Sequence, residues 1–366
     1  MSDARFMALA LSLGARGLGR VWPRPAVGCV LVRDGRIVGR GWTQGQSGPH
    51  GEAMALAQAG AAAHGATAYV TLEPCAHYGR TPPCSDALVA AGVARVVSAL
   101  EDPDPRVSGR GHARLRAAGI RVETGLMAAE ALAAHAGFLS RVRRGRPVLT
   151  LKLATSFDGR IATASGESRW ITGPAARREV HLERSRHDAV LVGAGTARAD
   201  DPSLTVRGLG IDWQPVRVVA SRRLELPLDG ALARTARDIP VWVLHGPDAP
   251  ADRRAAWEAT GARLLPVAQG DGRQLDPHAM LAALGEAGLT RVYCEGGGAL
   301  AATLLGAGLV DRLTGYTAGL ALGAEGRPAL GAMDLARLSE APRFALTALR
   351  AVGGDVEHVW QGTPPA

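Results

Sequence analysis

The stretch TLEPCAHYGRTPPC at residues 71–84 decides how this chain is interpreted, because it places Cys75 just after an expected strand and Cys84 at the start of the next expected helix. It follows His50-Gly51-Glu52, and a histidine with two cysteines can bind Zn²⁺ while leaving the fourth coordination position open for water. Zinc lowers the pKa of a bound water from about 15.7 towards about 7. We therefore expect Zn²⁺ at His50, Cys75 and Cys84, with Glu52 as the catalytic residue that moves protons without binding the metal.

A closed structural zinc site is the main alternative interpretation. It requires a fourth protein ligand, and His77, which lies between the two cysteines, is the obvious candidate. Glu52 would then have no role, so the residue pattern favours the catalytic site.

Length and composition indicate a soluble enzyme with two domains. A chain of 366 residues is long for one compact domain and allows two, each with its own core. The apolar content of 47% is ordinary, and no apolar run approaches the roughly 18 residues that suggest a membrane span. The N-terminus lacks the basic start and apolar block of a secretion signal, so we expect a cytoplasmic protein with no membrane partner. Four cysteines could form two disulfides, but a reducing compartment and the zinc spacing argue against it.

The net charge of +8 raises the question of a nucleic-acid partner. The basic residues are scattered rather than gathered in a stripe that could follow phosphates, so we expect none. Lys152 is the only lysine, and asparagine is absent, which suggests a coding bias. A lysine retained against that bias suggests a site where a slim ammonium works and a guanidinium does not, although chance survival stays open.

Hydrophobic periodicity predicts an α/β fold in both halves. In the first half it predicts helices over 3–17, 50–63, 85–91, 111–118 and 128–143, and strands over 27–32, 36–41, 68–72, 95–99 and 120–122. In the second half it predicts helices over 174–186, 275–286 and 298–307. The strands expected there are 147–154, 188–192, 215–220, 240–245, 290–294, 311–318, 343–350 and 355–360. We place the domains at 1–146 and 147–366, because the arginine-rich segment 141–146 suits a solvated junction.

The order His-x-Glu, Pro-Cys and a second cysteine resembles the signature of zinc-dependent nucleobase deaminases, with eight residues between the cysteines instead of two. The whole 71–84 stretch resembles the deaminase half of the bifunctional riboflavin-biosynthesis deaminase/reductase family. The resemblance implies an N-terminal cytidine-deaminase-like three-layer domain. It also implies that His77 and Arg80 lie near the pyrimidine and the ribose phosphate of the substrate.

Three positions depart from the pattern of that family. The family usually has Pro-Asn-Pro where this chain has Arg24 between two prolines, alanine where it has Gly51, and asparagine where it has Asp104. Arginine offers donors but no acceptor, and glycine at a helix start loosens the backbone. A reductase with a weakened or inactive deaminase half is therefore the alternative function.

Three further stretches resemble the reductase half of the same family, which is similar to dihydrofolate reductase in fold. They are LKLATSFDGR at 151–160, SGESRWIT at 165–172 and GAGTARADDPSLTVR at 193–207. By position, the resemblance implies NADPH contacts at Ala154, Trp170, Thr196 and Asp200. It implies substrate contacts at Ser168, Arg184, Leu204 and Arg207.

Glu295-Gly296-Gly297-Gly298 follows an expected strand and opens an expected helix. Glycines allow close approach of the backbone, and a helix start offers free N–H groups, so Gly297 and Gly298 are expected at the cofactor pyrophosphate. Lys152 and Glu295 either assist opening of the ribose ring or bind its hydroxyls.

The family resemblance implies two successive reactions on small-molecule pyrimidine ribotides. The first is zinc-dependent hydrolytic deamination of 2,5-diamino-6-(5-phosphoribosylamino)pyrimidin-4(3H)-one. The second is NADPH-dependent reduction of the ribose of 5-amino-6-(5-phosphoribosylamino)uracil to a ribityl chain. A homo-oligomer is expected.

Overall fold

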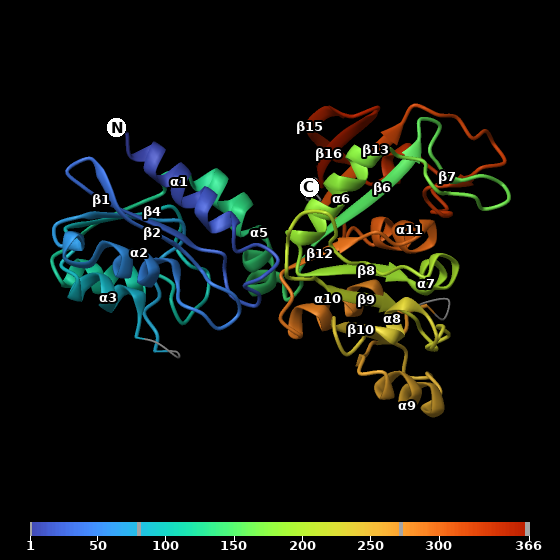
Figure 1. Ribbon diagram of the computed structural model, residues 1–366, viewed down its shortest axis with the longest axis horizontal. Coiled ribbons are helices and arrows are strands. Elements are labelled where there is room, and N and C mark those ends of the chain that lie inside the picture. Colours follow the sequence, from blue (N-terminus) through green and yellow to red (C-terminus); the bar gives the residue numbers. More distant parts are fainter. Residues whose placement is uncertain (1, 79–81, 271–273, 363–366) are drawn as a thin grey trace. The chain divides into compact units, whose positions relative to one another are not determined.

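A computed structural model describes residues 2–78, 82–270 and 274–362. The chain divides into two compact units, an N-terminal unit of residues 1–145 and a C-terminal unit of residues 146–366 (Figure 1). None of the helices in the described ranges is both long enough and apolar enough to cross a membrane.

The N-terminal unit is built on a five-stranded sheet of order β2-β1-β3-β4-β5. Its strands are β1 (Gly28–Arg33), β2 (Arg36–Trp42), β3 (Thr67–Val70), β4 (Arg95–Ser98) and β5 (Arg121–Thr124). β1 runs antiparallel to both of its neighbours, whereas β3, β4 and β5 are parallel. β1 and β2 form a hairpin that turns at Asp34-Gly35, with both residues at positive φ.

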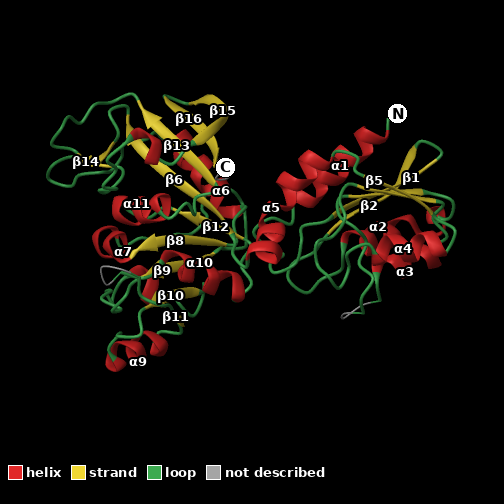
Figure 2. Ribbon diagram, turned by 180° about the vertical axis from the view of Figure 1, so that it is seen from behind, coloured by secondary structure: helices red, strands yellow, loops and turns green. Residues whose placement is uncertain are grey.

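Helices cover both faces of this sheet, which confirms the predicted three layers (Figure 2). One face carries α1 (Asp3–Ala15) and α5 (Ala128–Arg144). The other carries α2 (Gly51–Ala59), which continues as a 3₁₀ turn (Gly60–Ala63), with α3 (Cys84–Ala90) and α4 (Arg110–Ala117). Side chains of β1 alternate between the two layers, since Val30 packs in the cluster of α1 and Leu31 in the cluster of α2 and α3.

The C-terminal unit is built on a nine-stranded sheet of order β11-β10-β9-β8-β12-β6-β13-β16-β15. The first seven strands in this order are parallel, and β16 and β15 are antiparallel to their neighbours. The strands are β6 (Val148–Ser156), β8 (Ala189–Gly193), β9 (Val216–Ala220), β10 (Val241–His245), β11 (Arg263–Pro266), β12 (Arg291–Cys294), β13 (Arg312–Ala318), β15 (Phe344–Val352) and β16 (Asp355–Gly362). A separate two-stranded ribbon joins β7 (Arg160–Ala162) to β14 (Arg327–Pro328).

The helices of this unit connect the parallel strands. They are α6 (Pro174–Ser185), α7 (Ala194–Asp200), α8 (Ala231–Arg234), α9 (Ala251–Ala259), α10 (Pro277–Glu286) and α11 (Gly298–Gly306), with a 3₁₀ turn at Leu338–Glu340. Because the strands are parallel, the residues that follow β6, β8 and β12 meet at one edge of the sheet. That edge carries the residues predicted to bind cofactor and substrate.

Candidate active sites

His50, Cys75 and Cys84 come together in the N-terminal unit as the sequence predicts. His50 is the residue before α2, Cys75 lies in the loop after β3, and Cys84 is the first residue of α3. Their ligand atoms lie within 4.8 Å of one another, with His50 Nδ1 3.3 Å from Cys84 Sγ and 3.7 Å from Cys75 Sγ. Nitrogen and sulfur bound to one tetrahedral zinc ion are roughly 3.5 Å apart, so the donor set and its spacing fit zinc.

The site has the open character of a catalytic centre. Among the described residues, no fourth ligand joins this group, and His77 is not part of it. Hydrogen bonding from Cys84 lowers the pKa of Cys75 to about 4, and hydrogen bonding to Cys75 raises the pKa of Cys84. A thiolate is the form that binds a metal.

Glu52 lies in the first turn of α2, and its side chain is 3% exposed. Burial raises the pKa of this carboxyl to about 7, against the opposing effect of His50. A carboxyl with a pKa near neutrality can both accept and donate a proton at the pH of the cell. The geometry therefore suits the catalytic role predicted for Glu52.

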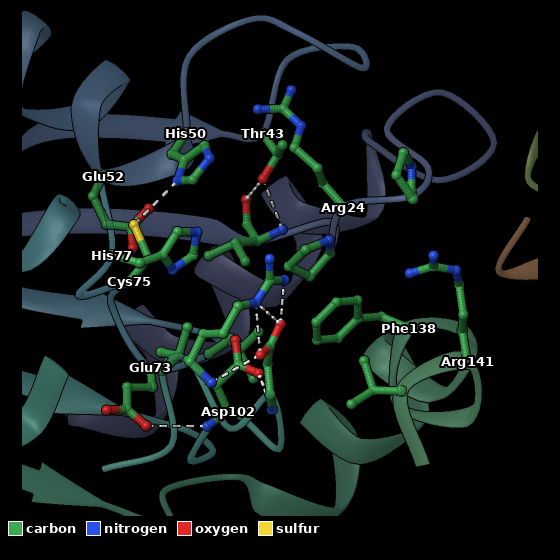
Figure 3. A pocket seen from close by; sticks show the side chains of 18 residues that line it. Arg24, Thr43, His50, Glu52, Glu73, Cys75, His77, Asp102, Phe138 and Arg141 are labelled. Atoms are coloured by element: carbon green, nitrogen blue, oxygen red, sulfur yellow. Dashed lines mark hydrogen bonds and ion pairs between the residues drawn. The ribbon is translucent and has the colours of Figure 1, made fainter. Parts of the chain in front are cut away.

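A cavity of about 380 Å³ opens beside these residues (Figure 3). Figure 3 shows His50, Glu52 and Cys75 on one side of it and Phe138 and Arg141 of α5 on the other. Its lining comes from segments far apart in the sequence: Pro23, Arg24, Pro25, Val27, Thr43, His50, Glu52, Leu72, Glu73, Cys75, His77, Asp102, Asp104, Arg106, Val107, Phe138, Arg141 and Val142. Sequence reasoning missed Thr43, Phe138 and Arg141, because no local motif marks residues that reach a pocket from another layer.

Two side chains predicted to hold the substrate belong to the loop between the cysteines. His77 lines the cavity, and its buried Nδ1 makes no hydrogen bond with any described residue, so it is available to a ligand. Arg80 lies outside the described residues.

The departures at Arg24 and Gly51 have structural explanations. The guanidinium of Arg24 donates to the carbonyl oxygens of Gln44 (2.9 Å), Gly45 and Gly48 (2.9 Å), so it holds the loop before His50. A Cβ at Gly51 would lie 2.9 Å from the carbonyl oxygen of Val27, so the missing side chain lets α2 start directly against β1. The described residues give no sign of an inactive deaminase.

Glu73 organises the wall of the cavity beside Cys75. Its carboxylate, 3% exposed, accepts N–H groups of Asp102 (3.2 Å), Gly109 (3.0 Å), Gly111 (2.8 Å) and His112 (3.1 Å). A Cβ at Gly111 would lie 2.0 Å from the carbonyl oxygen of Pro74, so α4 begins in contact with the segment that carries Cys75. Burial raises the pKa of Asp102, which also lines the cavity, to about 6.

In the C-terminal unit, Lys152, Glu295 and Arg184 form one charged cluster. Cys294 pairs with Leu151, so the next residues on these adjacent strands, Glu295 and Lys152, are neighbours. Arg184 of α6 donates to both carboxylate oxygens of Glu295, at 2.5 and 3.0 Å. Burial lowers the pKa of Lys152, and the charge of Glu295 opposes that shift.

The residues predicted to contact NADPH surround the same edge of the sheet. The N–H of Gly297, just before α11, donates to Thr196 Oγ1 of α7 at 3.0 Å, which ties together the two helix starts after β8 and β12. The carbonyl oxygen of Asp200 accepts from Arg169 at 3.0 Å, which brings the loop of Ser168 and Trp170 to the end of α7. Trp170 is 66% exposed, and Arg177 lies 4.5 Å from its ring centre. Ala154 is on β6, and Gly298 opens α11.

The predicted substrate residues Leu204 and Arg207 lie on one loop after α7. Arg184 donates to the carbonyl oxygen of Thr205 in that loop at 2.8 Å, so the loop and the charged cluster are in contact. Sequence reasoning missed His181 and Gln214, whose side chains also bind this loop. No motif around either residue signals such a contact.

Comparison with known proteins assigns both halves of the chain to known families. The family described as the RibD C-terminal domain matches residues 147–357, and the cytidine and deoxycytidylate deaminase zinc-binding region matches residues 1–100. The riboflavin biosynthesis protein RibD of Escherichia coli is 45% identical, covering 97% of this chain and 98% of its own. The corresponding protein of Haemophilus influenzae is 40% identical, covering 97% and 96%.

Solved structures resemble the chain over its whole length. Acinetobacter baumannii RibD superposes with a TM-score of 0.89 at 40% identity, covering 99% of both chains. A diaminohydroxyphosphoribosylaminopyrimidine deaminase/5-amino-6-(5-phosphoribosylamino)uracil reductase from Thermotoga maritima superposes with a TM-score of 0.85 at 32% identity, covering 98% of both.

Proposed function

The chain belongs to the RibD family of riboflavin-biosynthesis enzymes, and from this premise we propose which of its residues carry the two reactions of the family. The enzyme is a zinc-dependent deaminase and an NADPH-dependent reductase, with a cytidine-deaminase-like fold followed by a dihydrofolate-reductase-like one. It deaminates 2,5-diamino-6-(5-phosphoribosylamino)pyrimidin-4(3H)-one and then reduces the ribose of 5-amino-6-(5-phosphoribosylamino)uracil.

We propose that His50, Cys75 and Cys84 hold the zinc ion, which when bound activates a water molecule as the nucleophile. Glu52 accepts the first proton of that water on its carboxylate and delivers it to the ring nitrogen. It then carries the second proton, from the hydroxyl now on the ring carbon, to the amino group, which leaves as ammonia. The observation that carries the deaminase assignment is the grouping of His50, Cys75 and Cys84 beside a cavity that His50, Glu52 and Cys75 line. His77 binds the pyrimidine through its buried ring nitrogen, and Arg80 binds the phosphate.

For the reductase, we propose that Ala154, Trp170, Thr196, Asp200, Gly297 and Gly298 bind NADPH. The bond from Gly297 to Thr196 supports this, because it joins two helix starts where a pyrophosphate would meet free N–H groups. NADPH supplies the hydride, so the protein has only to orient the ribose carbon and balance charge. Lys152, Ser168, Arg184, Leu204, Arg207 and Glu295 bind the substrate.

Mixing the purified enzyme with the diaminopyrimidine ribotide and NADPH tests both assignments. We expect steady loss of NADPH absorbance, abolished by Glu52→Gln and restored in that variant by the already deaminated ribotide. The zinc content of the variant should stay at one ion per chain. If Glu52→Gln still releases ammonia at the wild-type rate, the catalytic role of Glu52 is wrong. If the wild-type enzyme consumes NADPH with the deaminated ribotide but not with the diaminopyrimidine ribotide, its deaminase half is inactive.

We also propose a cytoplasmic homo-oligomer. Four cysteines outside any disulfide support this location, because thiols are kept reduced in the cytoplasm. The association follows from β15, the edge strand of the large sheet, where residues 345–351 are all exposed.

A further inference from the structure

The loop of residues 203–207 in the C-terminal unit has an unfavourable backbone conformation. Leu204 has φ +53°, in the left-handed region, and its side chain is 3% exposed. A branched residue in that region costs on the order of 1–3 kcal/mol and persists only where the surroundings impose it. The contacts of this loop must therefore supply the constraint.

Three side chains from two other segments supply it: His181 and Arg184 of α6, and Gln214. The carbonyl oxygen of Thr205 accepts from Arg184 at 2.8 Å and lies 3.1 Å from Nδ1 of His181. The amide of Gln214 engages both backbone groups of Val206, accepting its N–H at 2.7 Å and donating to its carbonyl oxygen at 3.1 Å. The two peptide groups on either side of Val206 are thus fixed by side chains rather than by a strand or a helix.

His181 has a second contact with the same loop. Its Nδ1 lies 3.3 Å from the backbone nitrogen of Arg207 as well as 3.1 Å from the carbonyl oxygen of Thr205. A protonated Nδ1 donates to the carbonyl, and an unprotonated one accepts from the amide of Arg207. In either tautomer His181 bonds to the backbone of the segment that presents Arg207.

We propose that His181 and Gln214 are positioning residues of the reductase, which fix the 203–207 loop so that Leu204 and Arg207 meet the substrate. The inference rests on the proposed substrate role of Arg207. Arg184 contacts the same loop but also binds Glu295, so it joins this support to the charged cluster. Burial, together with Arg184 and Arg207, lowers the pKa of His181, so the ring is neutral at neutral pH.

Substitutions that separate positioning from chemistry test this. His181→Ala should raise KM for the deaminated ribotide by about 3- to 10-fold, the value of one lost hydrogen bond, with kcat and the KM for NADPH little changed. His181→Asn places an amide near the position of Nδ1 and should restore KM to within about 3-fold of wild type. Gln214→Ala should raise KM in the same way. The unchanged KM for NADPH reports that the C-terminal unit is folded, and ammonia release by the N-terminal unit should not change.

Arg207→Ala, measured in parallel, separates this inference from the site assignment. If Arg207→Ala raises KM while His181→Ala and Gln214→Ala leave it unchanged, the positioning role is wrong and the substrate site stands. If Arg207→Ala leaves KM unchanged, the substrate role fails and the positioning role falls with it. A loss of kcat at constant KM in His181→Ala, not rescued by asparagine, would assign the ring to the chemistry instead and overturn the inference.

Discussion

Lys152 lies in a crowded charged cluster, so a substitution can test whether its ammonium group is needed for the reductase reaction. It lies on β6 beside Glu295, with burial lowering its pKa, and the guanidinium of Arg184 occupies the other side of Glu295. Lys152→Arg keeps the charge but adds a broad planar group to a crowded cluster. We expect the reductase kcat/KM to fall about 10- to 100-fold, the cost of misplacing one charged hydrogen bond. The rate of NADPH oxidation with the deaminated ribotide measures this kcat/KM.

Lys152→Met, which keeps the length and removes the charge, is the matched control for that experiment. It should lose at least as much activity as Lys152→Arg, while both variants release ammonia normally. Wild-type kcat/KM in Lys152→Arg would mean that the single lysine of the chain survived by chance.

At the same residue scale, the sequence predicts the residues that carry the chemistry of the zinc site. It does not predict the residues that hold the surrounding loops in place. His50, Glu52, Cys75 and Cys84 carry their roles in residue type and spacing, so the sequence alone identifies them. The function of Glu73 depends on N–H groups 29 to 39 positions later in the chain, which only the fold brings to it. Arg24 is similar, because its partners are carbonyl oxygens that any sequence provides.

The support that Glu73 gives to α4 is a prediction at the scale of elements. Glu73→Gln replaces one acceptor oxygen by a donor, so two of the four backbone N–H groups it binds would lose their acceptor. Each buried unpaired group costs about 1–3 kcal/mol. We expect the N-terminal unit to melt at lower temperature and to lose zinc faster to a chelator, measured by calorimetry and metal analysis.

Glu101→Gln is the control for Glu73→Gln, because Glu101 is exposed and, among the described residues, accepts one hydrogen bond, from Ser108 in the same wall. It should behave like wild type, and reductase activity should be normal in both variants. Equal melting and equal zinc retention in Glu73→Gln and Glu101→Gln would contradict a supporting role for Glu73.

His187 joins α6 to β6 and makes the stability of the C-terminal unit depend on pH. Its Nδ1 donates to the carbonyl oxygen of Glu183 at 2.7 Å, and its Nε2 accepts from Thr150 at 3.0 Å. Burial lowers the pKa of His187 from 6.5 to about 4. Between pH 4 and pH 6.5 the histidine is protonated in the unfolded chain but not in the folded one. The contribution of His187 to folding stability is therefore complete above about pH 6.5 and falls as the pH is lowered towards 4. The loss from about pH 7 to about pH 5 should be about 2 kcal/mol.

Calorimetry of the full chain at these two pH values measures the effect of His187, with the transition of the C-terminal unit identified by its upward shift on adding NADPH. His187→Phe cannot take up the proton. It should be less stable at both pH values but should lose about 2 kcal/mol less between them. The same pH dependence in wild type and variant would rule His187 out as its source.

The elements themselves were predictable where an apolar period was long. The strands and helices of the N-terminal unit and the central strands β6, β8, β9, β10 and β12 lie within a few residues of their predicted ranges. The sequence missed α7, α8 and α9 together with β7 and β11. α7 and α8 are too short to show a hydrophobic period. α9 has one buried side chain, Trp257, and β11 has no buried residue, so neither gives a clear apolar pattern.

At the scale of the whole molecule, β15 is the feature without a covering partner among the described residues. It is the last strand of the nine-stranded sheet, and Leu346 and Leu349 are 49% and 65% exposed, next to Val356 of β16 at 42%. An exposed apolar edge strand pairs readily with another strand. Two copies related by a two-fold axis can pair β15 with β15, because such an interface uses the same surface twice.

Light scattering at micromolar concentration should therefore give the mass of a dimer or a larger even oligomer. Leu349→Lys places a charge at the centre of the edge and should shift the population towards the monomer. Leu132→Lys is the matched control, since Leu132 is a 43% exposed leucine in the N-terminal unit and should leave the mass unchanged. A monomeric wild-type enzyme would refute the homo-oligomer. If the variant with both Leu346→Lys and Leu349→Lys is still an oligomer, the interface does not involve β15. Two buried, unpaired lysines cannot be accommodated between closely packed strands.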